Sequence, residues 1–275
     1  MEESNLTHGS LFSGIGGFEL GAEMSGIKTL WNCEIEGHKR NILKRHFPEA
    51  VQYTDICLMK SPLHVDIISG GFPCQDISIA NVSNKKLWEN GKVKGINGER
   101  SGLWKEYKRI LCEVRPRYIV FENSPMLIHR GLEQVLCDLT ESGYDCQWEC
   151  LSASQFGFNH KRERIYGIAY PIEIKCEGVV KIFRPIQEIF PKWAPRQPPI
   201  SIPIKRFNKR SSYDDVRMDD GFSDRLDKRR IEDMGNAVIP LIAQYLFECI
   251  KIFDKQLDYE YDSDIPEEAV KFLNM

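Results

Sequence analysis

Short apolar segments alternate with helical patterns over the first 170 residues, and this alternation limits the fold more than any other feature of the sequence. Residues 65–68 and 118–121 are typical of buried strands, whereas residues 101–114 and 131–142 carry helical periodicity. Strands and helices that alternate in this way build an α/β sheet. In open sheets of this class, ligands and reacting groups lie at the carboxyl ends of the strands.

A glycine-rich turn follows the first apolar segment. Residues 11–18 read Leu-Phe-Ser-Gly-Ile-Gly-Gly-Phe, and a helical pattern continues to Met24. Glycines at this place allow the backbone to approach a ligand closely at a helix N-terminus. The spacing matches neither the dinucleotide fingerprint nor a P-loop. The turn therefore suits a nucleoside without a phosphate chain, and a plain strand-to-helix turn is the alternative.

A cysteine lies on the turn that leaves the strand at residues 65–68. Residues 72–75 read Phe-Pro-Cys-Gln, so Cys74 would lie at the carboxyl end of that strand. Its thiolate would be a nucleophile if the site lowered the pKa of the thiol. Most cysteines are small buried hydrophobic residues, so this motif needs support from other parts of the chain.

Acidic residues end three neighbouring strand candidates. Glu34 follows residues 28–33, and Asp55 follows residues 51–54. A carboxylate in the first position suits a ribose diol, and one further along the sheet suits an exocyclic amine. Glu122 follows residues 118–121 and would place an acid beside the thiol in one cleft. Each acid taken singly could instead be a solvated surface residue.

Taken in order, these motifs resemble those of the cytosine-5 DNA methyltransferases. The family's cofactor turn matches residues 12–17, its Pro-Cys-Gln nucleophile matches residues 73–75, and its Glu-Asn pair matches residues 122–123. Its Gly-Asn-Ala-Val matches residues 235–238. The Gln-x-Arg-x-Arg element keeps both arginines but has His160 in place of glutamine. The resemblance covers nearly the whole chain outside residues 171–216 and the tail after about residue 255.

The resemblance implies a class I S-adenosylmethionine-dependent methyltransferase with a Rossmann-like fold. This fold is a mostly parallel seven-stranded sheet with helices on both faces. We expect residues 1–170 and 228–275 to form the catalytic and cofactor-binding domain, and residues 171–227 to form a small target-recognition lobe. The implied reaction is methylation at C5 of a flipped-out cytosine in a specific sequence of duplex DNA, through a covalent bond between Cys74 and C6.

The resemblance also implies three groups of site residues and no metal. The catalytic residues would be Cys74, Glu122, Arg162 and Arg164. The S-adenosylmethionine contacts would come from Phe12, Ser13, Gly14, Ile15, Gly16, Gly17, Glu34, Ile35, Asp55, Ile56, Gly71, Pro73, Asn236, Ala237 and Val238. The substrate contacts would come from Gln75, Ser78 and Asn123, the last holding the nucleophile loop in place, and from Lys205, Arg206, Lys209 and Arg210.

Charge is distributed unevenly along the chain. The formal net charge is −3, which by itself is unfavourable for a DNA partner. Residues 171–213, however, hold nine Lys and Arg against three acids, and seven of the 14 prolines lie at residues 171–203. A basic, proline-rich segment of this kind indicates a phosphate-binding lobe, with a solvated loop as the alternative. The resemblance implies that the polar residues 81–100 form the lid over the extracted base, with a disordered surface segment without function as the alternative.

Composition agrees with a single cytoplasmic enzyme. We expect a monomer, and a cognate restriction endonuclease is a possible partner. No apolar stretch of 18 residues and no N-terminal signal pattern is present, so we expect no membrane partner. Nine cysteines without a Cys-x-x-Cys pair favour a reducing compartment. A tRNA cytosine methyltransferase would use the same Cys and Glu, but its Cys-Phe-Thr signature is absent from the sequence. An inactive DNA-binding homologue is the other alternative.

Overall fold

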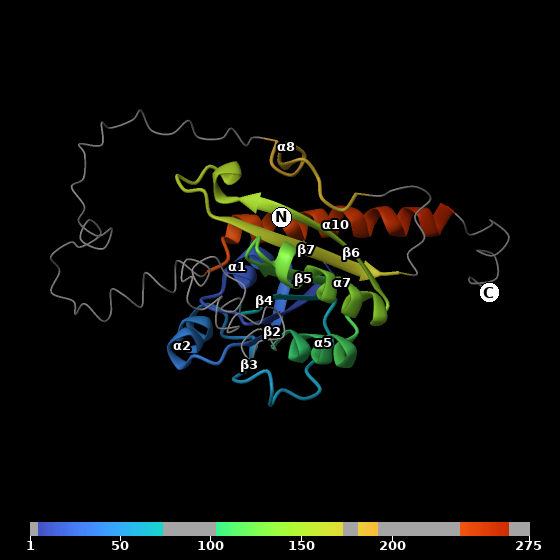
Figure 1. Ribbon diagram of the computed structural model, residues 1–275. Coiled ribbons are helices and arrows are strands. Elements are labelled where there is room, and N and C mark those ends of the chain that lie inside the picture. The colour runs from blue at the N-terminus through green and yellow to red at the C-terminus, as the bar shows by residue number, and fades with distance from the viewer. Residues whose placement is uncertain (1–4, 74–102, 173–180, 192–236, 264–275) are drawn as a thin grey trace, which may run out of the picture.

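The computed structural model describes residues 5–73, 103–172, 181–191 and 237–263, with side chains in the last segment as far as residue 257 (Figure 1). Within these residues, seven strands form one sheet in the order β3-β2-β1-β4-β5-β7-β6. The strands are β1 (Thr7–Leu11), β2 (Lys28–Cys33), β3 (Val51–Tyr53), β4 (Ile67–Gly71), β5 (Tyr118–Asn123), β6 (Tyr144–Ser152) and β7 (Glu163–Pro171). Strands β1 to β5 pair in parallel, whereas β7 is antiparallel to β5 and β6. The predicted mostly parallel seven-stranded sheet is confirmed.

Helices cover both faces of this sheet (Figure 1). The described helices are α1 (Gly17–Met24), α2 (Gly37–His46), α5 (Leu103–Val114), α6 (Leu127–Arg130), α7 (Leu132–Glu141), α8 (Ile186–Ile189) and α10 (Pro240–Ser263), with a 3₁₀ turn, η2 (Ala153–Phe156). Helices α5, α6 and α7 contribute to one buried apolar cluster, which contains Trp104 and Tyr107. Helices α1 and α10 contribute to a second cluster on the other face, which contains Phe18 and Leu246. All six residues of β5 are buried, as expected for a central strand covered on both faces.

The C-terminal helix differs from its prediction. The sequence pattern predicts a helix over residues 231–253, whereas α10 begins at Pro240 and continues to Ser263. Proline lacks an N–H and has a fixed φ, so it suits the first position of a helix, and it disfavours helical geometry in the residue before it. The three described residues before it, 237–239, are accordingly not helical.

Helices α1 and α10 pack at very short range. A Cβ placed on Gly21 would lie 2.5 Å from the Cβ of Ala243 and 2.8 Å from the backbone nitrogen of Gln244. A Cβ on Gly17 would lie 2.3 Å from the carbonyl oxygen of Val238. Only glycine allows this approach, so the first helix of the chain and the last described one form a single layer (Figure 1).

Part of the proline-rich region packs onto the same layer. Ile182 and Phe183 are buried in the second apolar cluster, and the Tyr245 hydroxyl donates to the Arg184 carbonyl. These residues belong to the range predicted for the recognition lobe, most of which lies outside the described residues. The lobe and its boundaries stay a prediction.

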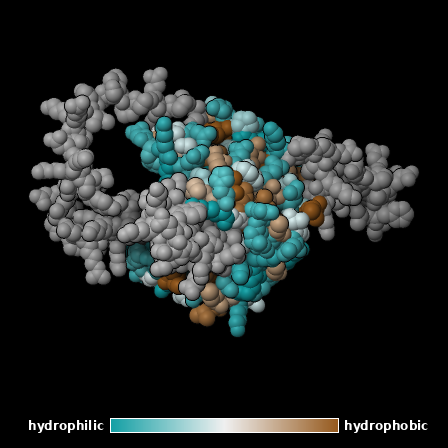
Figure 2. All heavy atoms as spheres, in the orientation of Figure 1, coloured by the Kyte–Doolittle hydropathy of each residue, from teal (hydrophilic) through white to brown (hydrophobic). Residues whose placement is uncertain are grey.

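The surface of the described residues mixes polar and apolar side chains. On the face in Figure 2, brown apolar residues are separated by teal hydrophilic ones. No helix in the described part of the chain has the length and apolar character needed to cross a membrane.

Candidate active site

The glycine-rich turn after β1 adopts left-handed backbone conformations. The φ angles are 54° at Phe12, 59° at Gly14 and 95° at Gly16, which is the N-cap of α1. Apart from Gly14 and its two chain neighbours, no atom of the described residues lies within 4 Å of the position that a Cβ on Gly14 would occupy. Ser13, by contrast, is buried, and its N–H donates to the Cys33 carbonyl (3.0 Å). The turn is therefore anchored on β2 and open at Gly14.

Glu34 connects the end of β2 to this turn. One carboxyl oxygen accepts from the Gly14 N–H (2.8 Å), and the other accepts from the Glu36 N–H (2.9 Å). Each oxygen has a second lone pair, so the carboxylate can accept further hydrogen bonds from a ligand. The next residue, Ile35, is 68% exposed. Glu34 thus lies beside the open turn with an exposed apolar side chain next to it.

The connection after β3 is held by Arg109 of α5. Its guanidinium donates to the carbonyls of Ile56 (2.6 Å) and Met59 (3.0 Å). Asp55 accepts from the Cys57 N–H (2.9 Å) and remains partly exposed. The Ile56 side chain is only 5% exposed and belongs to the core, and Ile15 is half-buried, so of the three isoleucines assigned to the cofactor only Ile35 is an exposed apolar side chain.

Glu122 forms a buried ion pair at the end of β5. Its carboxyl oxygen lies 3.0 Å from Nε of Arg164, which follows the start of the antiparallel strand β7. Burial raises the pKa of Glu122, and the charges of Arg164 and Arg162 oppose this rise. A Cβ on Gly71 would lie 2.8 Å from the other carboxyl oxygen, so β4 can pass beside the acid only without a side chain.

Asn123 holds the segment that follows β4. Its amide nitrogen donates to the carbonyl of Phe72 (3.1 Å), and its amide oxygen accepts from the Ser124 N–H (2.8 Å). Phe72 is buried against Trp104, with ring centroids 5.2 Å apart. Pro73 is the last described residue of this segment, and Cys74 follows it directly.

Arg162 connects β7 to the segment before α10. Its guanidinium donates to the carbonyl of Ala237, while its Nε is buried without a hydrogen-bond partner among the described residues. Because the neighbouring Val238 lies on Gly17, the structure brings residues 12–17, 162 and 237–238 together. The remaining predicted site residues lie outside the described residues: Cys74, Gln75, Ser78, Lys205, Arg206, Lys209, Arg210 and Asn236.

Sequence reasoning missed two sets of residues near the site. The first is Arg109. Its position on a predicted helix does not indicate that it binds the backbone of a loop about fifty residues earlier in the chain. The other is a pair of buried polar side chains, Glu19 and Asn32, whose polar atoms lack hydrogen-bond partners among the described residues. A glutamate within an apolar helical pattern was the signal available for Glu19. The described residues contain no group of His, Cys, Asp and Glu that could hold a metal ion.

The sheet order and the polar groups at its carboxyl edge define a class I, Rossmann-like methyltransferase fold. The profile of the family described as C-5 cytosine-specific DNA methylase matches residues 6–217, about three quarters of the chain. The protein belongs to this family.

Curated relatives are similar over more than half of the chain. The type II methyltransferase M2.BsuMI of Bacillus subtilis is 33% identical over 168 residues, which are 58% of this chain and 41% of that protein. M.CviJI, from Paramecium bursaria Chlorella virus IL3A, is 31% identical over 202 residues, 72% of this chain and 51% of that protein. The chain thus spans about half the length of the curated relatives it matches.

One solved structure supports the fold alone. It is a prophage-encoded E. coli protein described as a DNA modification methyltransferase, with a TM-score of 0.52 and 24% sequence identity. The similarity covers 66% of this chain and 51% of that one.

Proposed function

We propose that this protein transfers a methyl group from S-adenosylmethionine to C5 of cytosine in duplex DNA. The observation that carries the proposal is the arrangement at the ends of β4 and β5. A buried acid, Glu122, lies against Gly71, and the neighbouring Asn123 binds the backbone of Phe72, two residues before Cys74. This arrangement supports an acid and a thiol acting on one substrate. Family membership and the type II methyltransferases among the relatives point to the same reaction.

The residues at the end of β1 and β2 fit the nucleoside part of S-adenosylmethionine. The turn is open at Gly14, and Glu34 beside it has free acceptor capacity for a ribose diol. The exposed Ile35 offers an apolar surface to a purine ring, and Asp55 can accept from its amine. S-adenosylmethionine would supply an electrophilic methyl group on a sulfonium. Ala237 and Val238 would close the pocket above α1.

Residues of this chain would make C5 of cytosine nucleophilic enough to accept the methyl group. C5 of cytosine is a weak nucleophile, so electrons have to be pushed into the ring first. The Cys74 thiolate would form a bond to C6, and the carboxyl of Glu122 would give its proton to N3, where the negative charge settles. Burial favours the protonated form of Glu122, as this step requires. The methyl group would pass to C5 and leave a neutral thioether in place of the sulfonium. The C5 proton then leaves to solvent, the C6–S bond breaks to release the Cys74 thiolate, N3 returns its proton to Glu122, and the ring regains its aromaticity.

Arg164 and Asn123 would act through other groups. Arg164 keeps the Glu122 carboxyl oriented through a 3.0 Å contact and stabilises the carboxylate left after proton transfer. Asn123 fixes the backbone that leads to the nucleophile. The reacting atoms are inaccessible within a duplex, so the target nucleotide has to be flipped out. Lys205, Arg206, Lys209 and Arg210 would contact the phosphates of the DNA.

Covalent trapping tests this proposal. Duplex DNA with 5-fluorocytosine should trap the wild-type protein, because fluorine at C5 cannot leave as a cation. Cys74→Ser should lose both trapping and tritiated methyl transfer, while Cys137→Ser, a change at an exposed cysteine of α7, should keep both. Persistent trapping by Cys74→Ser would contradict the assignment of the nucleophile. Methyl transfer to tRNA and not to duplex DNA would move the protein to the alternative substrate class.

A further inference from the structure

A group of polar side chains is buried beneath the cofactor turn, between β1, β2 and the first turn of α1. Ser10 of β1 and Asn32 of β2 are register partners, so their side chains lie on the same face of the sheet. Ser13 belongs to the turn itself, and Glu19 extends from α1. All four residues are at least 93% buried. None of them enters the chemistry proposed above by its side chain.

Within the described ranges, the carboxyl of Glu19 forms no ion pair with a cationic side chain. Neither of its oxygens has a hydrogen-bond partner of good geometry among the described residues, and the same is true of the amide of Asn32. An ionised carboxylate without donors or a cation is one of the most costly groups to bury. Burial accordingly raises the pKa of Glu19 to about 7, while its own backbone N–H and the hydroxyls of Ser13 and Ser10 oppose the rise.

The hydrogen bonds of the turn are those expected when Glu19 is neutral. The Ser13 hydroxyl donates toward the hydroxyl (3.0 Å) and the carbonyl (3.3 Å) of Ser10, and among the described residues it makes no hydrogen bond of good geometry with the carboxyl of Glu19. An ionised carboxylate would attract that O–H and draw it away from Ser10. It would also repel Glu34, whose charge acts on Glu19 and whose carboxylate holds the Gly14 N–H. Ionisation would thus weaken two contacts that fix the turn.

We propose that Glu19 is a positioning residue of the cofactor turn, that its carboxyl has to be neutral for the turn to keep this geometry, and that binding of S-adenosylmethionine therefore weakens when this carboxyl ionises. The inference rests on the proposed function, because it concerns the same cofactor site. It adds a proton-linked control of cofactor affinity to that site.

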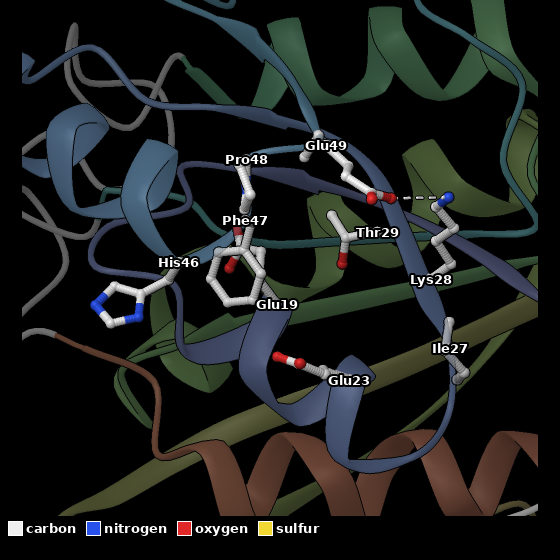
Figure 3. Close-up of a pocket in the computed structure, with 10 residues that line it drawn as sticks. Glu19, Glu23, Ile27, Lys28, Thr29, His46, Phe47, Pro48 and Glu49 are labelled. Atoms are coloured by element: carbon white, nitrogen blue, oxygen red, sulfur yellow. Dashed lines mark ion pairs between the residues drawn. The ribbon is translucent and has the colours of Figure 1, made fainter.

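Few other titratable groups face Glu19. Figure 3 shows it on α1 behind the ring of Phe47, next to a hollow of about 250 Å³. The other charged or titratable groups around this hollow are Glu23 of α1, Lys28 of β2, His46 of α2 and Glu49, which pairs with Lys28 at 3.1 Å. On β1, burial lowers the pKa of His8 to about 3, so this imidazole stays neutral in the relevant range. On α10, Lys251 pairs with Glu248 and binds the Ser25 carbonyl beyond the end of α1.

Calorimetric binding of S-adenosylmethionine from pH 6.0 to 8.5 tests the inference. The variants are Glu19→Gln, a neutral group of the same shape, and Glu23→Gln, a control one helical turn further on at an exposed position. The ratio of the wild-type to the Glu19→Gln dissociation constant should rise about thirtyfold over this range, because one proton is linked to binding and the pKa of the Glu19 carboxyl is about 7. Titration of the ligand's own amino group cancels in this ratio. The Glu23→Gln control should follow the wild type.

A second measurement keeps the test valid if Glu19→Gln is poorly folded. Wild-type binding at pH 7.5 should take up part of a proton, seen as a dependence of the binding heat on the ionisation enthalpy of the buffer. A ratio of dissociation constants that stays constant with pH would overturn the inference. So would a Glu19→Gln protein that binds weakly at every pH while the wild type takes up no proton on binding. Absence of wild-type binding at every pH would instead overturn the proposed function, and with it this inference.

Discussion

Replacing Glu19 by Gln should stabilise the protein in a pH-dependent way, independently of any ligand. The carboxyl is fully buried, and its pKa is raised from 4.5 to about 7 in the folded protein. Between these two values the unfolded chain has lost the proton that the folded chain keeps. The free energy of unfolding of the wild type therefore falls as the pH rises through this window, and the loss is complete above pH 7.

The size of the effect follows from the shift. A shift of one pKa unit corresponds to about 1.4 kcal/mol. Relative to low pH, where Glu19 is protonated in both states, the free energy of unfolding of the wild type is lower by about 0.8 kcal/mol at pH 5 and by about 3.4 kcal/mol at pH 8. Glutamine keeps the shape of the protonated acid and has no proton to lose. The stability difference between Glu19→Gln and wild type should therefore increase by about 2.5 kcal/mol from pH 5 to pH 8.

Urea unfolding of both proteins at pH 5 and pH 8, with m-values compared, measures this difference. Groups that titrate equally in both proteins cancel, and Glu23→Gln provides the control because that side chain is exposed on the same helix. An equal stability difference at the two pH values would refute the reasoning. It would mean that the carboxyl finds donors or water in the folded protein.

Three further outcomes follow from single contacts. Asn123→Ala should lower the rate of methyl transfer and leave the affinity for S-adenosylmethionine unchanged, measured by kinetics and calorimetry, because it frees the Phe72 carbonyl and the Ser124 N–H, neither of which belongs to the cofactor turn. Glu34→Ala should weaken cofactor binding by about 1–3 kcal/mol, since a buried hydrogen bond would be lost; unchanged affinity would argue against the pocket. Gly21→Ala should cost about 1–2 kcal/mol in urea unfolding, because the clash with Ala243 exceeds the helix-propensity gain of about 1 kcal/mol; a stabilised variant would contradict this.

The sheet and the position of its polar edge could be predicted because the relevant signals are local. The predicted strand over residues 28–33 has the same bounds as β2, and the one predicted over residues 118–121 begins with β5 at Tyr118, although β5 continues through Glu122 to Asn123. The edge strand β6 carried no such signal, because most of its residues are exposed or only partly buried, without regular alternation, and they include charged side chains. The start of α10 was misjudged since residues 231–239 continue the apolar spacing, whereas Pro240 sets the helix start.

Contacts between distant segments could not be predicted from spacing. No sequence pattern indicates that the Asn123 amide binds the Phe72 carbonyl, or that Arg162 binds the Ala237 carbonyl. These bonds depend on side-chain directions that only the assembled sheet fixes. For the same reason, residue spacing does not encode which DNA bases the protein would recognise, because base readout depends on the side chains that enter the groove.

The part of the site that would bind the cofactor and the part that would bind cytosine are stabilised by different kinds of contact. The two parts should therefore respond differently to amino-acid substitutions. The cofactor half depends on close backbone packing, since Gly21 lets α10 lie against α1, and Gly17 does the same for Val238 just before α10, without space for a Cβ at either glycine. The half that would bind cytosine depends on directed polar contacts, since Arg164 and Asn123 fix an acid and a backbone segment. Added volume should therefore disturb the first half, whereas loss of a charge or an amide should disturb the second. The buried carboxyl of Glu19 is the exception, because in the cofactor half a single proton decides whether the turn keeps its contacts.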